Sequence, residues 1–169
     1  MHTRVAGFTL LELLITLVIM TTLLAMAYPS FSGLVRKNKH NSEVLEVYQA
    51  LQFARYTAIS HNDLVTVCPI SEGKCSEDWS QPISVFLDPL NQKAISKPQH
   101  LKRVFQGPKY NTLQPFPASK RLFQFRGTGE TKGTPGRIEI TLLHAAENDP
   151  RTKSKVILSW SGRPRVVRE

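Results

Sequence analysis

The chain has 169 residues, which limits it to one domain of ordinary size and excludes an array of several domains. Its formal net charge is +9, from 22 basic and 13 acidic residues, so an anionic partner such as nucleic acid or a phospholipid surface is electrostatically favoured. Charge alone does not decide between these two partners.

The first apolar segment lies at residues 8–28, which read FTLLELLITLVIMTTLLAMAY and contain one charged residue, Glu12. As an α-helix this segment would extend about 31 Å, enough to cross the hydrocarbon core of a bilayer. Seven residues precede it and include His2 and Arg4, and positive charge on this flank keeps the N-terminus in the cytoplasm. We therefore expect a transmembrane helix at 8–28, with the rest of the chain exported.

A cleaved secretory signal is the alternative explanation of this segment, because Ala25, Met26 and Ala27 imitate a small-residue cleavage site. Glu12 argues against it. A carboxylate within an apolar run costs about 2.5–3.5 kcal/mol at the helix centre, so it requires a compensation that a disposable signal would not need. Glu12 then either pairs with a positive group, or snorkels from the first helical turn, where the helix dipole favours an anion.

Residues 7–14, Gly-Phe-Thr-Leu-Leu-Glu-Leu-Leu, resemble the class III leader motif of type IV pilins and type II secretion pseudopilins. The resemblance implies that a membrane-embedded prepilin peptidase removes residues 1–7 by cutting after Gly7, and methylates the amino group of Phe8. It also implies that Glu12 pairs with the Phe8 amine of a neighbouring pilin during filament assembly. The protein would start as a single-pass subunit of the bacterial inner membrane, with its C-terminal domain in the periplasm, and then enter the pilus at the cell surface.

The chain directly after this segment contains Pro29 and Gly33, which weaken a helix, so we expect a kink or a locally melted stretch there. Apolar residues then recur at three- and four-residue steps, which predicts the exported part of the same helix at 29–62, ending near Asp63. The stripe that should face a core consists of Val44, Val47, Tyr48, Leu51, Ala54, Ala58 and Ile59.

Residues 63–169 change to short β-rich runs separated by Gly, Pro, Asn and Ser, several with period-two alternation. Together with the helix they predict an α+β fold, in which an antiparallel sheet or a pair of sheets packs on the helix. Between Asp88 and Lys120, the prolines at 89, 98, 108 and 115 predict a long surface loop with one strand near Leu101–Phe105. The other expected strands are Leu64–Cys68, Ile83–Leu87, Leu122–Phe125, Arg137–Leu143 and Lys155–Trp160.

The two cysteines, Cys68 and Cys75, are separated by six residues, which suits a small disulfide loop in an exported domain. A zinc site would require four ligands, usually with tighter spacing, and His40, His61 and His100 form no ligand or catalytic pattern. The sequence contains no nucleophile elbow, phosphate-binding glycine loop or metal-binding helix motif. We therefore expect a disulfide, no metal, no cofactor and no enzymatic activity.

Further segments are similar to those of the FimT/GspH group of minor pilins and pseudopilins. The resemblance implies a type IV pilin fold, with a long N-terminal transmembrane helix packed on a C-terminal antiparallel β-sheet domain. The matching segments are residues 53–59, 65–68 and 85–88, together with Cys75 and Trp79.

Positive charge is concentrated beyond residue 96, where the sequence contains fifteen basic and five acidic residues. Gly162 permits a tight turn after an expected strand and Pro164 stiffens it, so Arg163 and Arg165 would project from a constrained loop. Guanidinium groups suit phosphate, which they bind with two hydrogen bonds. These four residues are similar to a C-terminal Gly-Arg-x-Arg motif of FimT-like pilins, which implies binding of double-stranded DNA during uptake in natural transformation. The basic residues expected to extend this patch are Lys102, Arg103, Lys120, Arg121, Arg151, Lys153 and Lys155.

Three other interpretations remain open. The two arginines are compatible with an ordinary solvated turn, and the chain is compatible with a type II secretion pseudopilin or with a structural minor pilin that primes pilus assembly. The basic domain and the motif at 162–165 favour the DNA-binding pilin, because neither alternative function requires them. Trp160 and Phe125 lie on strand patterns, so we expect them in the core and not as platforms for base stacking.

Overall fold

The computed structural model describes residues 9–143 and 152–168. Within this part, residues 26–30 and 32 are described by their backbone alone. The residues with a predicted function that lie outside the described part are Gly7, Phe8 and Arg151.

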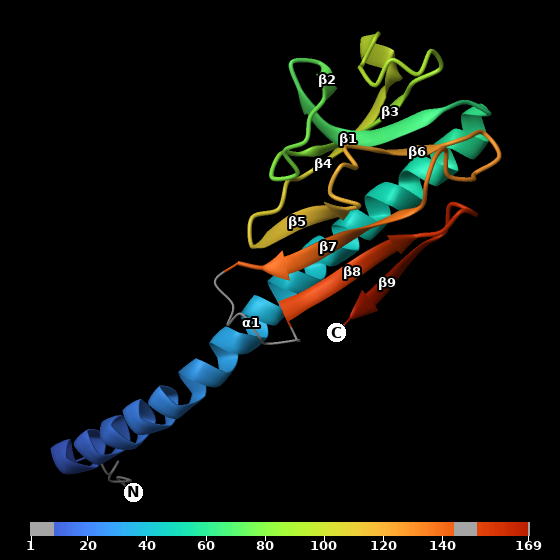
Figure 1. Cartoon of the computed structure of the whole chain (residues 1–169). Helices are drawn as coiled ribbons and strands as arrows, with labels where there is room; N and C mark the ends of the chain where they lie inside the picture. Colours follow the sequence, from blue (N-terminus) through green and yellow to red (C-terminus); the bar gives the residue numbers. More distant parts are fainter. Residues whose placement is uncertain (1–8, 144–151, 169) are drawn as a thin grey trace, which may run out of the picture. The chain divides into compact units, whose positions relative to one another are not determined.

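One long helix, α1, begins at Leu10 and ends at His61, as the sequence predicts (Figure 1). Its N-terminus is capped by Thr9, whose side-chain oxygen accepts a hydrogen bond of 3.3 Å from the backbone N–H of Glu12. The helix continues through Pro29 and Gly33 without a break, so the prediction of a melted stretch is wrong. A proline within a helix removes one backbone hydrogen bond and crowds the carbonyl four residues earlier, and a helix can accommodate both by bending without ending.

Contacts divide the chain into two units, residues 1–38 and residues 39–169. In the first unit, the apolar side chains between Leu10 and Leu24 are exposed on every side of the helix. Among the described residues, we find no helix with the length and apolar character needed to cross a membrane. The predicted span at 8–28 begins outside the described part and stays a prediction.

The second unit carries two antiparallel sheets, which confirms the α+β prediction (Figure 1). In the first sheet β1 is central, with β3 and then β4 on one side and both β2 and β6 on the other. The second sheet has the order β5, β7, β8, β9. The first sheet consists of β1 (Val65–Ser71), β2 (Lys74–Cys75), β3 (Ile83–Leu87), β4 (Leu101–Phe105, preceded by the 3-10 helix η1 at Pro98–His100) and β6 (Phe123–Phe125). The second consists of β5 (Asn111–Phe116), β7 (Gly136–Leu142), β8 (Lys153–Leu158) and β9 (Pro164–Arg168).

The hydrophobic core lies where the apolar stripe of α1 meets both sheets. Most of the predicted stripe is buried, and each fully buried Val, Leu or Phe side chain stabilises the fold by about 1.5–3 kcal/mol relative to exposure. Ile59 departs from the prediction with 45% exposure, because it lies at the flank of the stripe beside Gly129. The strand residues that complete the core include Val65, Val67, Val85, Phe123, Phe125, Ile138, Ile140, Val156 and Leu158.

A buried polar cluster joins α1 to the second sheet. The two ring nitrogens of His40 lie 2.5 Å from Oδ1 of Asn111 on β5 and 2.9 Å from Oγ of Ser154 on β8. The amide of Asn111 donates in turn to the carboxylate of Glu43 at 2.6 Å. Because every member of this cluster has a partner, it fixes one position of the helix against the strands.

Two strands of the second sheet, β5 and β9, are not predicted by the sequence. Each contains a proline, Pro115 or Pro164, and each is an edge strand, where a missing N–H does not interrupt the pairing. The surface loop predicted between residues 88 and 120 is therefore wrong for residues 111–116. The strand expected within it at 101–105 is confirmed as β4.

The predictions that Trp160 and Phe125 lie in the core have different outcomes. Phe125 is fully buried in β6, as expected. Strand β8 ends at Leu158, two residues earlier than predicted, and Trp160 is 65% exposed. The prediction that Trp160 belongs to the core is wrong because the chain turns before the alternation of β8 reaches it.

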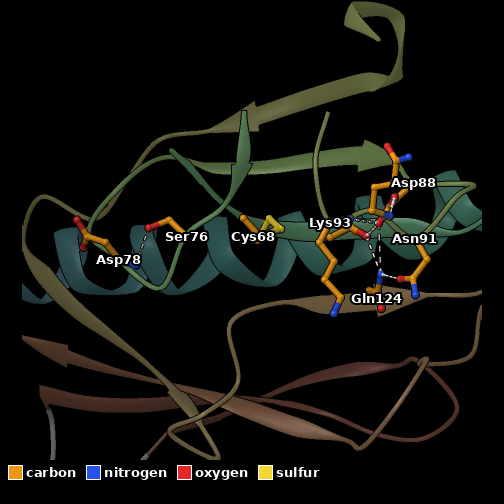
Figure 2. The surroundings of a disulfide bond; sticks show 10 residues. Cys68, Ser76, Asp78, Asp88, Asn91, Lys93 and Gln124 are labelled. Atoms are coloured by element: carbon orange, nitrogen blue, oxygen red, sulfur yellow. Dashed lines mark hydrogen bonds between the residues drawn. A yellow bond between two sulfur atoms is a disulfide. The ribbon is translucent and has the colours of Figure 1, made fainter. Parts of the chain in front are cut away.

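The predicted disulfide is present and joins Cys68 in β1 to Cys75 in β2, with a Cα–Cα distance of 5.6 Å. Figure 2 shows the bond between two polar clusters, with Ser76 and Asp78 on one side. On the other side, Asp88 is buried and its carboxylate accepts hydrogen bonds from the Thr66 hydroxyl and from two backbone N–H groups of the loop after β3. Together the disulfide and Asp88 hold the loops at both ends of the β1–β3 pair.

Candidate functional site

The predicted arginine loop is a tight connection between β8 and β9. The N–H of Gly162 donates to the carbonyl of Ser159 at 3.0 Å, which closes a turn with Trp160 at its tip. The sequence places Arg165 in a loop, but the structure places it in β9, where it pairs with Ile157 of β8. The stiffening expected from Pro164 comes from its place as the first residue of that strand, where it is buried.

This turn is held against the segment between β6 and β7. Thr131 donates from its backbone N–H to the carbonyl of Trp160 at 3.1 Å, and its hydroxyl contacts the same carbonyl at 3.1 Å. Gly162 has a φ of +72°, and a Cβ at this position would lie 1.9 Å from the carbonyl oxygen of Gly129. The Nε of Arg55, on α1, donates to that same oxygen at 3.1 Å. Glycine is therefore required at 162 for its backbone conformation and for the close approach of two backbones.

Arg163 and Arg165 are both exposed, on either side of the buried Pro164. Among the described residues, neither guanidinium group has an ion pair or a side-chain hydrogen bond. Two other predicted cations share the outer face of the second sheet with Arg165, because Lys155 is paired with Val167 and Lys153 follows the same alternation along β8. Lys155 and Arg165 are diagonal neighbours on adjacent strands, and the backbone positions of such neighbours are roughly 7–8 Å apart.

The remaining predicted cations are placed elsewhere. Lys102 and Arg103 lie on β4, the edge strand of the other sheet. The Arg103 guanidinium lies over the rings of Phe53 and Phe105, at 5.5 and 4.8 Å from the ring centroids. Arg103 is thus engaged in cation–π contacts that hold it against the sheet, and the strand pairings do not join β4 to the β8–β9 turn.

A second cationic feature is a hollow of about 430 Å³ that opens between the disulfide region and the start of β7. Its lining includes Lys93, Lys120 and Arg121. The Lys120 ammonium donates to the carbonyl of Thr134, and its partial burial lowers the pKa of Lys120. Arg121 forms an exposed ion pair with Glu77, so it is less available to a ligand than an unpaired cation.

The sequence predicts no functional role for two residues at the turn, Arg55 and Trp160. Arg55 reaches Gly129, 74 positions away, and no local pattern on a helix predicts a contact of that range. The exposure of Trp160 is not predicted because the residue continues the apolar alternation of Val156 and Leu158, although β8 itself ends at Leu158. Within the described residues, no group of three or more His, Cys, Asp or Glu is arranged to hold a metal ion.

Comparisons with known proteins place the fold and the family. A model of the family described as type II transport protein GspH matches residues 43–162, and a model of the prokaryotic N-terminal methylation motif matches residues 2–28. The type IV minor pilin FimU of Pseudomonas aeruginosa has a similar fold, with a TM-score of 0.59 at 18% identity over 78% of this chain and 89% of that chain. The minor pseudopilin EpsH from the type 2 secretion system of Vibrio cholerae has a TM-score of 0.55 at 12% identity, over 77% of this chain and 97% of that chain. A comparison with curated proteins gives no match.

The helix and two antiparallel sheets therefore form a type IV pilin fold. The GspH match covers well over half of the chain, so the chain belongs to the GspH family. With the methylation motif at its N-terminus, it is a minor pilin or pseudopilin of a type IV pilus or a type II secretion system.

Proposed function

We propose that this protein is a minor pilin of a type IV pilus that binds extracellular double-stranded DNA through the β8–β9 turn and β9 during natural transformation. One observation carries the proposal: Arg163 and Arg165 are exposed, and among the described residues they have no ion-pair partner. A guanidinium group without a carboxylate beside it is free to bind a phosphate with two hydrogen bonds.

The anchoring of the turn lowers the entropic cost of binding. The backbone that carries the arginines is fixed by the close approach of Gly162 to Gly129 and by the hydrogen bonds of Thr131. Few degrees of freedom are therefore lost when DNA is bound. Lys153 and Lys155 on the same sheet face as Arg165 extend the positive surface. Such contacts to phosphate carry no direct sequence information, so binding is weakly sequence-selective and falls steeply as salt rises. Three other cations of the predicted patch are less strongly supported as DNA contacts. Lys102 and Arg103 lie on β4, and Arg151 lies outside the described residues.

The N-terminal part serves assembly in this proposal. Prepilin peptidase cuts between Gly7 and Phe8 and methylates Phe8, which is supported by the methylation motif matched at residues 2–28. The helix of residues 8–28 then holds the subunit in the inner membrane with its C-terminal domain in the periplasm, before it joins other pilins in the filament. The apolar side chains exposed all round residues 10–24 support this role, because such a surface needs lipid or neighbouring helices to cover it. Glu12, in the first helical turn, pairs with the Phe8 amine of a neighbouring pilin.

A role as a pseudopilin of a type II secretion system is the second candidate, and it is favoured by the GspH match and by the likeness to EpsH in fold. A purely structural minor pilin that primes assembly is the third. Neither role requires unpaired arginines on an anchored turn. Deletion of the gene distinguishes the three roles. A DNA-binding pilin predicts loss of DNA uptake, a pseudopilin predicts loss of protein secretion, and a structural pilin predicts loss of pilus assembly.

Binding of a short fluorescent DNA duplex to the full chain in a non-ionic detergent, followed by anisotropy, tests the proposal. We expect Arg163→Gln/Arg165→Gln to weaken binding by roughly tenfold or more, because each charge-assisted contact contributes over about 1 kcal/mol. The matched control is Lys74→Gln/Lys97→Gln, which removes the same charge from exposed positions on the first sheet and η1 side of the domain. Equal binding by the wild type and the arginine variant would refute the proposal.

A further inference from the structure

Trp160 is a large apolar side chain placed at the tip of the β8–β9 turn, with 65% of its surface exposed. The other tryptophan, Trp79, is 3% exposed and packs edge-on against Phe123, as is usual for this residue type. Single exposed apolar residues are common and need no explanation by themselves. Trp160 differs because it lies beside Arg163 and Arg165, which form no ion pair with any residue in the described part of the chain.

The backbone that carries the indole is fixed. The carbonyl of Trp160 accepts hydrogen bonds from both the N–H and the hydroxyl of Thr131, a residue that is 7% exposed. The turn is also closed by the bond from Gly162 to Ser159. The indole is therefore presented to solvent from a rigid support, which is the condition under which an aromatic ring binds a flat partner at low entropic cost.

The charges around the indole define the kind of ligand. Arg163 follows Trp160 by three residues in the same turn, and Arg165 begins the outer face of β9. A ligand that satisfies all three side chains offers phosphates to the arginines and an open aromatic face to the indole. A nucleotide with an unpaired base has both, whereas the bases of an intact duplex are stacked inside and their faces are covered.

We propose that Trp160 is a stacking site for an unpaired nucleobase, and that the β8–β9 turn prefers single-stranded DNA or duplexes with unpaired ends over blunt, fully paired duplexes. This inference rests on the proposed function for its phosphate contacts and adds a ligand preference to it. Stacking on one aromatic side chain is expected to strengthen binding by roughly 5- to 150-fold.

Tryptophan fluorescence of the full chain in a non-ionic detergent gives a direct test, because one of the two tryptophans is buried and the other is exposed. We expect unlabelled oligothymidylate to quench the Trp160 emission, and a blunt hairpin duplex of equal charge to quench it much less. Trp160→Phe should abolish the quenching while the Trp79 emission remains. Binding of oligothymidylate without quenching would overturn the inference.

Affinities measured by anisotropy complete the test. We expect Trp160→Ala to weaken binding of the oligothymidylate by roughly 5- to 150-fold and binding of the blunt hairpin much less, whereas Trp160→Phe should retain most of the affinity. Tyr56→Ala, at an aromatic residue of α1 that is 70% exposed, is the control and should change neither. We expect Trp160→Ala to fold as the wild type does, since Thr131 binds the backbone carbonyl that the substitution keeps.

The two proposals fail in distinguishable ways. If Arg163→Gln/Arg165→Gln loses binding while Trp160→Ala binds both DNAs as the wild type does, the stacking site is wrong and the DNA-binding proposal stands. If Trp160→Ala weakens both DNAs equally, the strand preference is wrong. If the arginine variant binds both DNAs unchanged, the proposed function fails and the stacking inference falls with it.

Discussion

Gly162 meets two separate requirements, a positive φ and a near approach to the carbonyl of Gly129. Gly133 meets the first alone, since its φ is +84° and no atom lies within 4 Å of the position of a Cβ. The pair therefore separates backbone strain from steric contact within one protein. At Gly162 the contact is with backbone, which cannot swing aside as a flexible side chain would.

We predict that Gly133→Ala lowers the free energy of unfolding by about 1 kcal/mol, the cost of backbone strain alone. Gly162→Ala should cost about 3 kcal/mol or more, because the turn must also move away from Gly129. Urea denaturation followed by circular dichroism measures both. Equal costs for the two variants would show that the turn does not dock as described.

Lys120 gives a prediction about pH. Burial disfavours its ammonium form, so the pKa of Lys120 in the folded state lies below its ordinary value of 10.5. Between these two values the unfolded chain binds more protons than the folded one, so the free energy of unfolding rises with pH across that window. Lys120→Met should remove this contribution, which urea denaturation at a series of alkaline pH values would detect as a flatter curve than that of the wild type. Parallel curves would contradict the assignment.

At the scale of elements, the disulfide closes a short loop between β1 and β2, while the core lies elsewhere between α1 and both sheets. Cys68→Ala/Cys75→Ala should therefore lower the free energy of unfolding by about 2–3 kcal/mol by the loop-entropy model, and leave the fold intact. Far-UV circular dichroism and urea denaturation of the oxidised wild type and the variant test this. An unfolded variant would mean that the bond is needed to form the sheet.

The elements with a strong local signal are those that the sequence predicts. Strand β3 and strand β4 match the expected Ile83–Leu87 and Leu101–Phe105, because their β-rich runs are bounded by turn residues. Strand β5 is missed because Pro115 argues against a strand unless its place at a sheet edge is known, and that place is set by tertiary pairing with β7. The same holds for β9 and Pro164.

The candidate site was predictable in its local chemistry and not in its surroundings. The turn at Gly162 and the exposure of Arg163 and Arg165 follow from residue types within a few positions. The docking on Gly129, the support from Arg55 and the exposure of Trp160 depend on where distant segments meet. Sequence reasoning therefore identifies the cations of the site, and the structure identifies the rigid frame and the aromatic residue beside them.

At the scale of the whole molecule, positive charge is concentrated in the C-terminal domain and apolar surface in the N-terminal helix. In the proposed function these two surfaces serve two tasks, assembly through the helix and binding of DNA through the C-terminal domain. Because most of the cations lie outside the β8–β9 turn, net charge alone would attract DNA without any dedicated site. In the proposed function the β8–β9 turn adds specific phosphate contacts to that general attraction.

The salt dependence of duplex binding distinguishes a dedicated site from general attraction, since the slope of log K against log salt counts the phosphates that a protein neutralises. We expect Arg163→Gln/Arg165→Gln to reduce the slope by about two relative to the wild type, in the full chain under identical conditions. Lys74→Gln/Lys97→Gln, with the same loss of charge, should leave the slope close to that of the wild type. An unchanged slope for the arginine variant, or an equal reduction in both variants, would contradict a dedicated DNA site at this turn.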